Sequence, residues 1–244
     1  MPWVDGKVVA RTEWAEGLVT LRVDAPAIDF APGQWLNLGL TLHGELVKRS
    51  YSIASAPGLP LELYLVVVEG GALSPHLCAL DVGDALLVQT DAQGFFTLDH
   101  VPDARDLWLL ATGTGLGPYI SMIRSGRLWS RFERVVLVHG ARHVDQLGYR
   151  DELEGIAERR AGFTYVPMVS RQDDERALRG RIPANLDNGR LEKAAGLSLR
   201  PELSHVLLCG NPDMIRDTTD ALAARGLRKH RTRKPGHIST EKYW

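Results

Sequence analysis

The chain changes its pattern once, near residue 101, and this change constrains the fold more than any other feature. Residues 3–100 contain short β-rich segments separated by turns, whereas from residue 107 apolar strands alternate with helical stretches. Many closely spaced short strands predict a closed or nearly closed antiparallel β-barrel. Strands that alternate with helices predict an α/β domain with a parallel sheet covered on both faces. We therefore expect two domains, residues 1–101 and 102–244.

The first half is expected to hold one short helix among its strands. The strands are predicted at Val8–Ala10, Leu18–Val23, Trp35–Leu38, Leu61–Val68 and Ala85–Val88. The segment Leu61–Val68 ends as a continuous apolar run, as expected of a central strand. Ser74 is expected to cap the helix, with Pro75 as its first residue.

The second half repeats a strand–helix order. Strands are predicted at Leu107–Ala111, Val135–His139, Thr164–Val169 and His205–Cys209. Helices are predicted at Tyr119–Ser125, at about 145–160, and after Asn211-Pro212. This order predicts βαβ units.

Composition excludes several classes of function. With 44% apolar residues, 24% charged residues and a net charge of −1, neither nucleic acid nor an acidic membrane is an expected partner. The two cysteines exclude a four-cysteine iron–sulfur cluster and give no zinc spacing, so no metal is expected. No signal peptide and no apolar run of spanning length are recognised, so cytoplasmic location is expected.

One segment combines an arginine, an aromatic ring and hydroxyl groups along a predicted strand, at 49–52. Arg49 and Tyr51 would point to one face, and Ser50 and Ser52 to the other. A guanidinium group suits a pyrophosphate, a tyrosine ring suits a flat heterocycle, and a serine hydroxyl suits a ring nitrogen. The pattern predicts a clamp for a flavin nucleotide; the alternative is an ordinary amphipathic strand.

A glycine-rich segment, 112–118, lies between a predicted strand and a predicted helix. Gly113 and Gly115 allow the backbone to approach a ligand, and the following helix start offers N–H groups to phosphate. The spacing is neither the Rossmann fingerprint nor a P-loop. Phosphate binding is the favoured interpretation, and a plain strand–helix turn is the alternative.

A second turn of the same kind follows Cys209. This cysteine would stand at the carboxyl end of a strand, where open α/β sheets bind ligands. Asn211 and Asp213 follow it and are candidate coenzyme contacts. By residue type alone a buried structural role is favoured for Cys209, and Cys78 is expected to lie in the core.

Arginines recur after the later strands, at Arg142, Arg171 and Arg181. Any one of them is best explained as a surface charge, but three beyond strand ends predict a pocket for an extra phosphate. No acidic residue lies where a ribose 2′-hydroxyl acceptor is expected early in this domain. These features favour NADP over NAD.

The segment 228–234 is strongly basic. A docking patch for an acidic protein is predicted, and a solvated helix end is the alternative. Its positive residues are Arg228, Lys229, Arg231, Arg233 and Lys234. The terminal Tyr243 and Trp244 are expected to stack on a flat group, because a free end normally frays.

Taken in order, these segments resemble the ferredoxin–NADP(+) reductases, and the bacterial ferredoxin/flavodoxin group in particular. The resemblance covers essentially the whole chain and implies an FAD-binding barrel followed by an NADP-binding domain. It implies that Arg49 binds the FAD pyrophosphate, that Tyr51 lies against the isoalloxazine, and that Ser52 approaches flavin N5. It implies further FAD contacts at Ser50, Tyr64, Leu65, Val66, Val67, Ala72, Leu73, Ser74 and Thr114.

For the coenzyme, the resemblance implies that the turn at Gly113 and Gly115 receives NADP and that Cys209 lies beside the nicotinamide. It assigns the adenosine phosphate to Arg142, Ser170, Arg171 and Arg181. Tyr243 and Trp244 would cover the flavin and the FAD adenine. Glu241 falls where plant-type members carry an active-site glutamate. Catalytic roles are thus implied for Ser52, Cys209, Glu241 and Tyr243.

The expected activity is FAD-dependent electron transfer between NADP(H) and ferredoxin or flavodoxin, by hydride exchange at flavin N5 and one-electron steps to the protein partner. A monomer is expected. One alternative is a related NAD(P)H-dependent reductase of a free flavin, a quinone or an oxygenase component. The other is a flavin-binding redox sensor without fast turnover.

Overall fold

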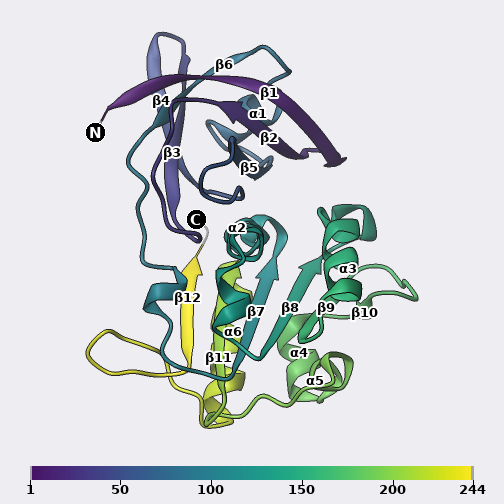
Figure 1. The fold of residues 1–244 in the computed structure, drawn as a ribbon. Helices are drawn as coiled ribbons and strands as arrows, with labels where there is room; N and C mark the ends of the chain where they lie inside the picture. Colours follow the sequence, from purple (N-terminus) through teal and green to yellow (C-terminus); the bar gives the residue numbers. More distant parts are fainter. Residues whose placement is uncertain (1, 243–244) are drawn as a thin grey trace. The chain divides into compact units, whose positions relative to one another are not determined.

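The computed structural model describes residues 2–242, so the expectations for Tyr243 and Trp244 lie outside the described residues. Its contacts divide the chain into two units. Unit 1 comprises Met1–Leu98 and Gly117–Gly126, and unit 2 comprises Asp99–Leu116 and Arg127–Trp244. Each unit is built around its own sheet (Figure 1).

Unit 1 contains a six-stranded antiparallel sheet of order β4-β3-β6-β1-β2-β5. Its strands are β1 (Trp3–Ala15), β2 (Leu18–Asp24), β3 (Trp35–Leu42), β4 (Glu45–Ser52), β5 (Leu61–Val66) and β6 (Ala85–Gln89). An antiparallel bridge from Ile53 to Leu63 connects the two ends of this order, and the Ala54 N–H donates to the Glu62 carbonyl at 2.8 Å. The predicted barrel is therefore confirmed.

Strand β5 differs from the prediction in two respects. It stands last in the strand order rather than at the centre, and it ends at Val66 rather than Val68. Val67 and Val68 are about two-fifths exposed, so the apolar run continues past the sheet. An apolar run alone does not distinguish a central strand from one whose far side is covered by barrel closure.

The short helix α1 (Ser74–Cys78) covers the barrel core, but its cap was predicted wrongly. Leu73 occupies the N-cap position, and Ser74 is the first helical residue. The Ser74 hydroxyl instead accepts the Val68 N–H at 3.0 Å. Cys78 is buried in the barrel core as predicted, and burial raises the pKa of its thiol to about 11.

Helix α2 (Gly117–Ser125) follows Leu116 of unit 2 directly in the chain but belongs to unit 1 by its contacts. The Ser121 hydroxyl donates to the Ser55 carbonyl at 2.7 Å. Arg124 forms a 2.6 Å ion pair with Glu62, whose side chain is 7% exposed. The helix is therefore fixed to the barrel by two polar contacts that link distant parts of the sequence.

Unit 2 contains a six-stranded sheet of order β10-β9-β8-β7-β11-β12, in which every pairing is parallel. The strands are β7 (Asp106–Thr112), β8 (Arg134–Ala141), β9 (Phe163–Val169), β10 (Leu178–Arg179), β11 (Ser204–Gly210) and β12 (Ile238–Lys242). The helices are α3 (Arg150–Arg159), α4 (Ile182–Asp187), α5 (Arg190–Ala195) and α6 (Pro212–Ala224). The predicted parallel α/β domain is confirmed.

The strand order reverses between β7 and β11. From β7 the chain adds β8, β9 and β10 on one side, and then returns to add β11 and β12 on the other. At such a reversal the connections that leave the two central strands run in opposite directions from their carboxyl ends. Open α/β sheets bind their ligands at this place. The glycine-rich turn follows β7 and the Cys209 turn ends β11, so both lie at this point.

Several elements of unit 2 differ from the prediction. The helix predicted at about 145–160 begins only at Arg150, because a 3₁₀ turn, Val144–Gln146, precedes it. The segment 228–234 is not a helix end, since α6 stops at Ala224 and the basic residues lie in a loop. The short elements α4, α5 and β10 and the terminal β12 were not predicted. Among the described residues, the helices are too short or too polar to cross a membrane.

Candidate functional site

In unit 1 the segment 49–52 ends β4, which pairs with β3 over its whole length. The Arg49 side chain is exposed, donates to the Lys48 carbonyl at 2.7 Å, and forms no ion pair within residues 2–242. A strand residue with an uncompensated positive charge is suited to binding an anion. Within the described part of the chain, the barrel therefore presents a guanidinium group with no carboxylate bound to it.

Tyr51 is half-buried against the barrel core, on the same face of the strand as Arg49. Burial, with a smaller contribution from the Cys78 thiol and an opposing effect of Arg49, raises the pKa of its phenol to about 12. The ring therefore stays neutral at any physiological pH. A neutral ring on apolar support beside an unpaired cation fits the ring and the pyrophosphate of a flavin nucleotide.

The hydroxyl groups of the same strand differ in their surroundings. Ser50 is exposed and donates to Asn37 Oδ1 at 2.9 Å, and Asn37 in turn donates to Gln89 at 2.5 Å. Ser52, at the end of β4, is buried opposite Trp35. A buried hydroxyl is better placed than an exposed one to hold a fixed hydrogen bond with a bound ring.

The second flavin segment lies on β5 and in the turn leading to α1. The side chains of Tyr64, Leu65 and Leu73 are buried, so Leu65 and Leu73 offer a ligand only their backbone. Val66 is half-buried, whereas Val67 and Ala72 are exposed. The buried Ser74 hydroxyl accepts the Val68 N–H and thereby orders this turn.

In unit 2 the two predicted turns interlock. A Cβ atom on Gly115 would lie 2.5 Å from the Cys209 carbonyl oxygen, and one on Gly210 would lie 2.3 Å from Thr112 Oγ1. The Asn211 N–H donates to that Thr112 hydroxyl at 2.9 Å. Only glycine fits at both positions, because the backbones of the turns after β7 and β11 are nearly in contact.

Thr112 was not assigned a role from the sequence, although it opens the glycine-rich segment. Its hydroxyl links the two turns, and it is partly exposed at the end of β7. Gly113 has a φ of +55°, and Thr114 is buried in the 3₁₀ turn Gly113–Leu116. The positive φ at Gly113 lets the chain turn sharply out of the strand, and Gly115 two residues later lies against Cys209 and Gly210.

Cys209 is fully buried at the end of β11. In the parallel pairing it stands beside Ala111 of β7 on one side and Glu241 of β12 on the other. The structure thus brings together two residues, Cys209 and Glu241, that the sequence separates by more than thirty positions. Both lie at the carboxyl edge of the sheet.

Asn211 and Asp213 are used at the start of α6. Asn211 Oδ1 accepts hydrogen bonds from the N–H groups of Asp213 and Met214 at 2.8 and 3.2 Å. Asn211 thereby caps α6 and gives partners to two N–H groups of its first turn. Asp213 is exposed and pairs with Arg216 at 2.7 Å. A carboxylate at this helix start disfavours phosphate, so these side chains suit a neutral part of a coenzyme.

The three predicted phosphate-binding arginines lie at the same edge of the sheet. Arg142 follows β8 and Arg171 follows β9, and the Arg171 N–H donates to the Arg142 carbonyl at 3.0 Å. Arg181 caps α4 just after Gly180, whose N–H donates to the last residue of β9. All three side chains are exposed, and none forms an ion pair within the described part of the chain.

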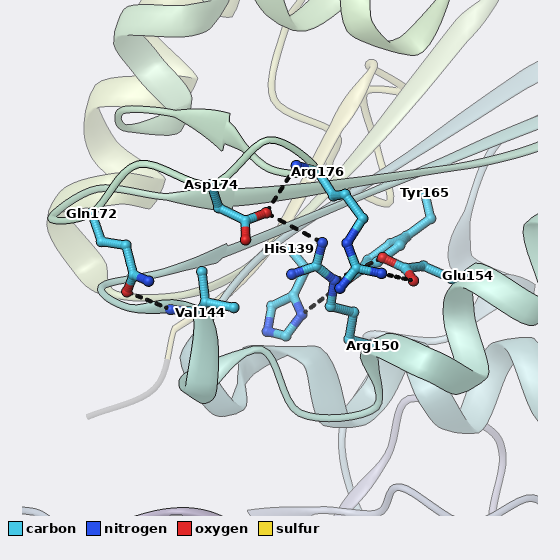
Figure 2. A network of polar contacts seen from close by, with 8 residues as sticks. All are labelled: His139, Val144, Arg150, Glu154, Tyr165, Gln172, Asp174 and Arg176. Carbon is cyan, nitrogen blue, oxygen red and sulfur yellow. Dashed lines mark hydrogen bonds and ion pairs between the residues drawn. The ribbon is translucent and has the colours of Figure 1, made fainter.

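Neighbouring arginines differ from these three in having carboxylate partners. Arg150 pairs with Glu154 at 2.7 Å and Arg176 pairs with the same carboxylate group at 3.4 Å (Figure 2). Arg179 pairs with Asp173 at 2.7 Å. As far as residues 2–242 show, Arg142, Arg171 and Arg181 therefore keep an uncompensated positive charge at this edge. Ser170, whose hydroxyl donates to the Ala141 carbonyl at 3.3 Å, directly precedes Arg171.

Two buried histidines on the central strands are neutral. Burial lowers the pKa of His139 on β8 to about 3, and its Nδ1 lies 3.2 Å from the Tyr165 hydroxyl. Burial also lowers the pKa of His205 on β11 to about 3, with smaller effects from the neighbouring His230 and His237. Neither imidazole faces solvent, so both contribute to the fold rather than to proton exchange with a ligand.

The basic loop 228–234 is held by backbone contacts to histidines. The Arg228 N–H donates to His237 Nδ1 at 3.0 Å, and the Gly236 N–H donates to His230 Nδ1 at 3.3 Å. The five basic side chains of the loop are all exposed. The backbone of the loop is thus ordered while its charges face solvent.

Two family models match the chain, one in its first half and one in its second half. Residues 7–96 match the oxidoreductase FAD-binding domain, and residues 109–220 match the oxidoreductase NAD-binding domain. The first range lies in the barrel. The second begins in β7 and includes both interlocked turns.

Relatives match over the full length. The flavodoxin/ferredoxin–NADP reductase of Escherichia coli is 45% identical over 99% of both chains, and that of Shigella flexneri is 46% identical over 99% of both. Among solved structures, a ferredoxin NADP+ reductase from Neisseria gonorrhoeae with bound FAD and NADP superposes with a TM-score of 0.93. It is 31% identical and matches over 98% of both chains.

Proposed function

The chain belongs to the flavodoxin/ferredoxin–NADP reductase family, and on this premise we propose that it transfers electrons between NADP(H) and ferredoxin or flavodoxin, using FAD. Bound FAD supplies the redox chemistry, because it exchanges a hydride with the nicotinamide and single electrons with a protein partner. The protein supplies binding, orientation and charge.

The observation that carries this proposal is the uncompensated charge beside the strand reversal. Interlocked turns at the carboxyl ends of β7 and β11 leave backbone close to a ligand. Three arginines that have no ion pair among the described residues follow β8, β9 and β10. A dinucleotide with an additional phosphate matches both features. NADP(H) is therefore preferred over NAD(H).

We propose the following roles for the barrel residues. Arg49 binds the pyrophosphate of FAD, the Tyr51 ring supports the isoalloxazine, and the Ser52 hydroxyl bonds to flavin N5. The unpaired guanidinium group, the neutral half-buried ring and the buried hydroxyl support these assignments. Ser50, Thr114 and the segments 64–67 and 72–74 complete the proposed FAD contacts.

At the coenzyme edge we propose that Cys209 lies against the nicotinamide. Its position beside Glu241 supports a shared role, in which the thiol shapes the apolar surface and the carboxylate orients polar groups. Gly113 and Gly115 line the pocket, and Asn211 and Asp213 contact neutral parts of the coenzyme. Tyr243 and Trp244, which cover the flavin and its adenine in this proposal, are beyond the described residues.

We further predict a domain boundary near residue 101, a cytoplasmic location and a monomeric state. The cytoplasmic location is supported by the presence of only two cysteines in the sequence, which are both buried and lie in different units. The other acceptor classes, a free flavin, a quinone or an oxygenase component, are separated from ferredoxin and flavodoxin by the partner experiment below.

We propose that the acidic electron-carrier partner docks on the basic loop 228–234. Changing Arg233 and Lys234 to glutamate is expected to slow reduction of ferredoxin and flavodoxin by about tenfold at low salt and to flatten the salt dependence of the rate, because complementary charge accelerates encounter. Stopped-flow rates at several ionic strengths measure both effects.

The matched control for docking is Arg190→Glu with Lys193→Glu. These residues are exposed on α5 of the same unit, and the variant changes the net charge by the same amount. It is expected to leave the partner rates and their salt dependence unchanged. Equal slowing in both variants, or in neither, would remove the docking proposal and favour one of the other acceptors.

Anaerobic titration tests the function as a whole. The purified protein with FAD is expected to lose its flavin absorption band rapidly on addition of NADPH and slowly on addition of NADH. The two coenzymes differ only in the 2′-phosphate, so the contrast reports the arginine pocket. Equal bleaching by both would contradict NADP selectivity, slow bleaching by both would favour a redox sensor, and no flavin band after added FAD would refute the proposal.

A further inference from the structure

The loop that carries Arg171 is tied to the rest of unit 2 at several points. At its start, the Ser170 and Arg171 N–H groups donate to the carbonyls of Ala141 and Arg142. Further along, Gln172 Oε1 accepts the Val144 N–H at 3.1 Å (Figure 2). The loop thus runs alongside the segment that leaves β8.

The far end of the loop is held by charge. Asp174 accepts from Arg150 Nη2 at 3.4 Å and from the Arg176 N–H at 2.9 Å. Arg150 Nε also donates to Glu154 at 2.7 Å, so a single guanidinium group bridges the loop and helix α3 (Figure 2). Arg176 contacts the other oxygen of Glu154 at 3.4 Å. The loop carboxylate and the helix carboxylate are therefore joined by two arginines.

Arg150 occupies a costly position for an arginine. Its side chain is only 8% exposed, and it is the first residue of α3, where the helix dipole disfavours positive charge. The preceding Tyr149 has a left-handed backbone with a φ of 61°. A buried cation at a helix start needs compensation, and the two carboxylates provide it.

We propose that Arg150 is a positioning residue for NADP selectivity: by fixing Asp174 it holds the 170–177 loop so that Arg171 stays beside Arg142 and both reach the 2′-phosphate. The proposal rests on the proposed function of the arginine pocket. Arg150 itself does not touch the coenzyme. Arg150, on α3, is paired with Glu154 and Asp174. Arg171, on the 170–177 loop, forms no ion pair among the described residues and is therefore available to the phosphate.

The test is Arg150→Met, which keeps an apolar side chain of similar length in the buried position. The ratio of kcat/KM for NADPH to that for NADH is expected to fall about tenfold, within the range for residues that act through a packed network. The change should appear in KM for NADPH and in the affinity for 2′-phospho-AMP. KM for NADH and both kcat values should stay within twofold.

Arg225→Met is the matched control. Arg225 is a partly buried arginine of the same unit, and it pairs with Glu192 at 2.6 Å rather than with the coenzyme loop. It is expected to lower stability without changing the coenzyme ratio. A second variant, Asp174→Asn, removes the negative charge of the loop at a side chain that is less buried than that of Arg150. It is expected to show the same loss of selectivity, and it provides the test if Arg150→Met does not fold.

The outcomes separate the two proposals. A wild-type protein that does not prefer NADPH refutes the arginine pocket itself. A wild-type preference that survives in both Arg150→Met and Asp174→Asn refutes the positioning role alone. An equal loss in Arg225→Met would also refute it, because the effect would then be one of general stability.

Discussion

Changing Arg142 and Arg171 together to methionine is expected to lower the preference for NADPH over NADH by about 10²–10⁴-fold. Each guanidinium group is expected to contribute roughly 1.5–3 kcal/mol to binding of the 2′-phosphate through charge-assisted hydrogen bonds. Both groups are exposed at the carboxyl edge of the sheet and have no carboxylate partner among the described residues, so their charge is available to a ligand.

The measurement is the ratio of kcat/KM for the two coenzymes, with KM for NADPH followed as a function of salt. The variant should lose most of the salt dependence, because the screened interaction is gone, while NADH kinetics stay unchanged. Arg179→Met is the control, since Arg179 lies nearby but is paired with Asp173. A change in the ratio of less than tenfold in the double variant would show that the 2′-phosphate is recognised elsewhere.

Lowering the pH from 7 to 5 is expected to destabilise unit 2 by roughly 4 kcal/mol, through two buried histidines. His139 and His205 are neutral in the folded protein because burial lowers the pKa of each to about 3. In the unfolded chain they take up a proton near their ordinary pKa of about 6.5. Each histidine therefore contributes roughly half of the expected loss.

The direction follows from proton binding. Between about pH 6.5 and pH 3 the unfolded state binds more protons than the folded state, so the free energy of unfolding falls as the pH falls. Above about pH 8 both histidines are essentially unprotonated in both states, and the contribution is constant. Below the folded pKa of about 3, both states are protonated and the contribution stops changing.

Hydrogen exchange of the backbone amides in β8 and β11, corrected for the intrinsic pH dependence of exchange, measures this effect in the FAD-loaded protein. His205→Asn, which keeps a polar contact for Ser239 without titrating, should halve the loss. His76→Asn, at an exposed position on α1, should keep all of it. Equal stability of wild type at pH 5 and pH 7 would contradict the account.

The sequence was sufficient for the architecture because periodicity and glycine placement are local. The change at residue 101 predicted the barrel and the parallel sheet, and the segment after Leu107–Ala111 predicted the turn at Gly113 and Gly115. The position of Cys209 at a strand end was predicted for the same reason. The N-cap of α1 was wrong by one residue because Ser74 has a partner, Val68, that propensity does not consider.

Contacts between residues that are distant in the chain could not be predicted from one sequence. Nothing local indicates that Gly115 touches Cys209, that Glu241 stands beside Cys209, or that Asp174 binds Arg150. The spacing of Arg150 and Glu154, four residues apart, was the available indication of one ion pair. The third partner, Asp174, comes from another loop and required the structure.

Helix α2 affects how the protein can be made. Unit 1 is completed by a segment that is synthesised only after β7 of the other sheet, because Ser121 and Arg124 bond to Ser55 and Glu62. Until then the nascent barrel lacks the contacts that α2 makes with Ser55 and with the Glu62 side chain. We therefore expect the barrel to gain these contacts only after residue 126 has emerged, and a gene fragment cut near residue 101 would encode a barrel without α2.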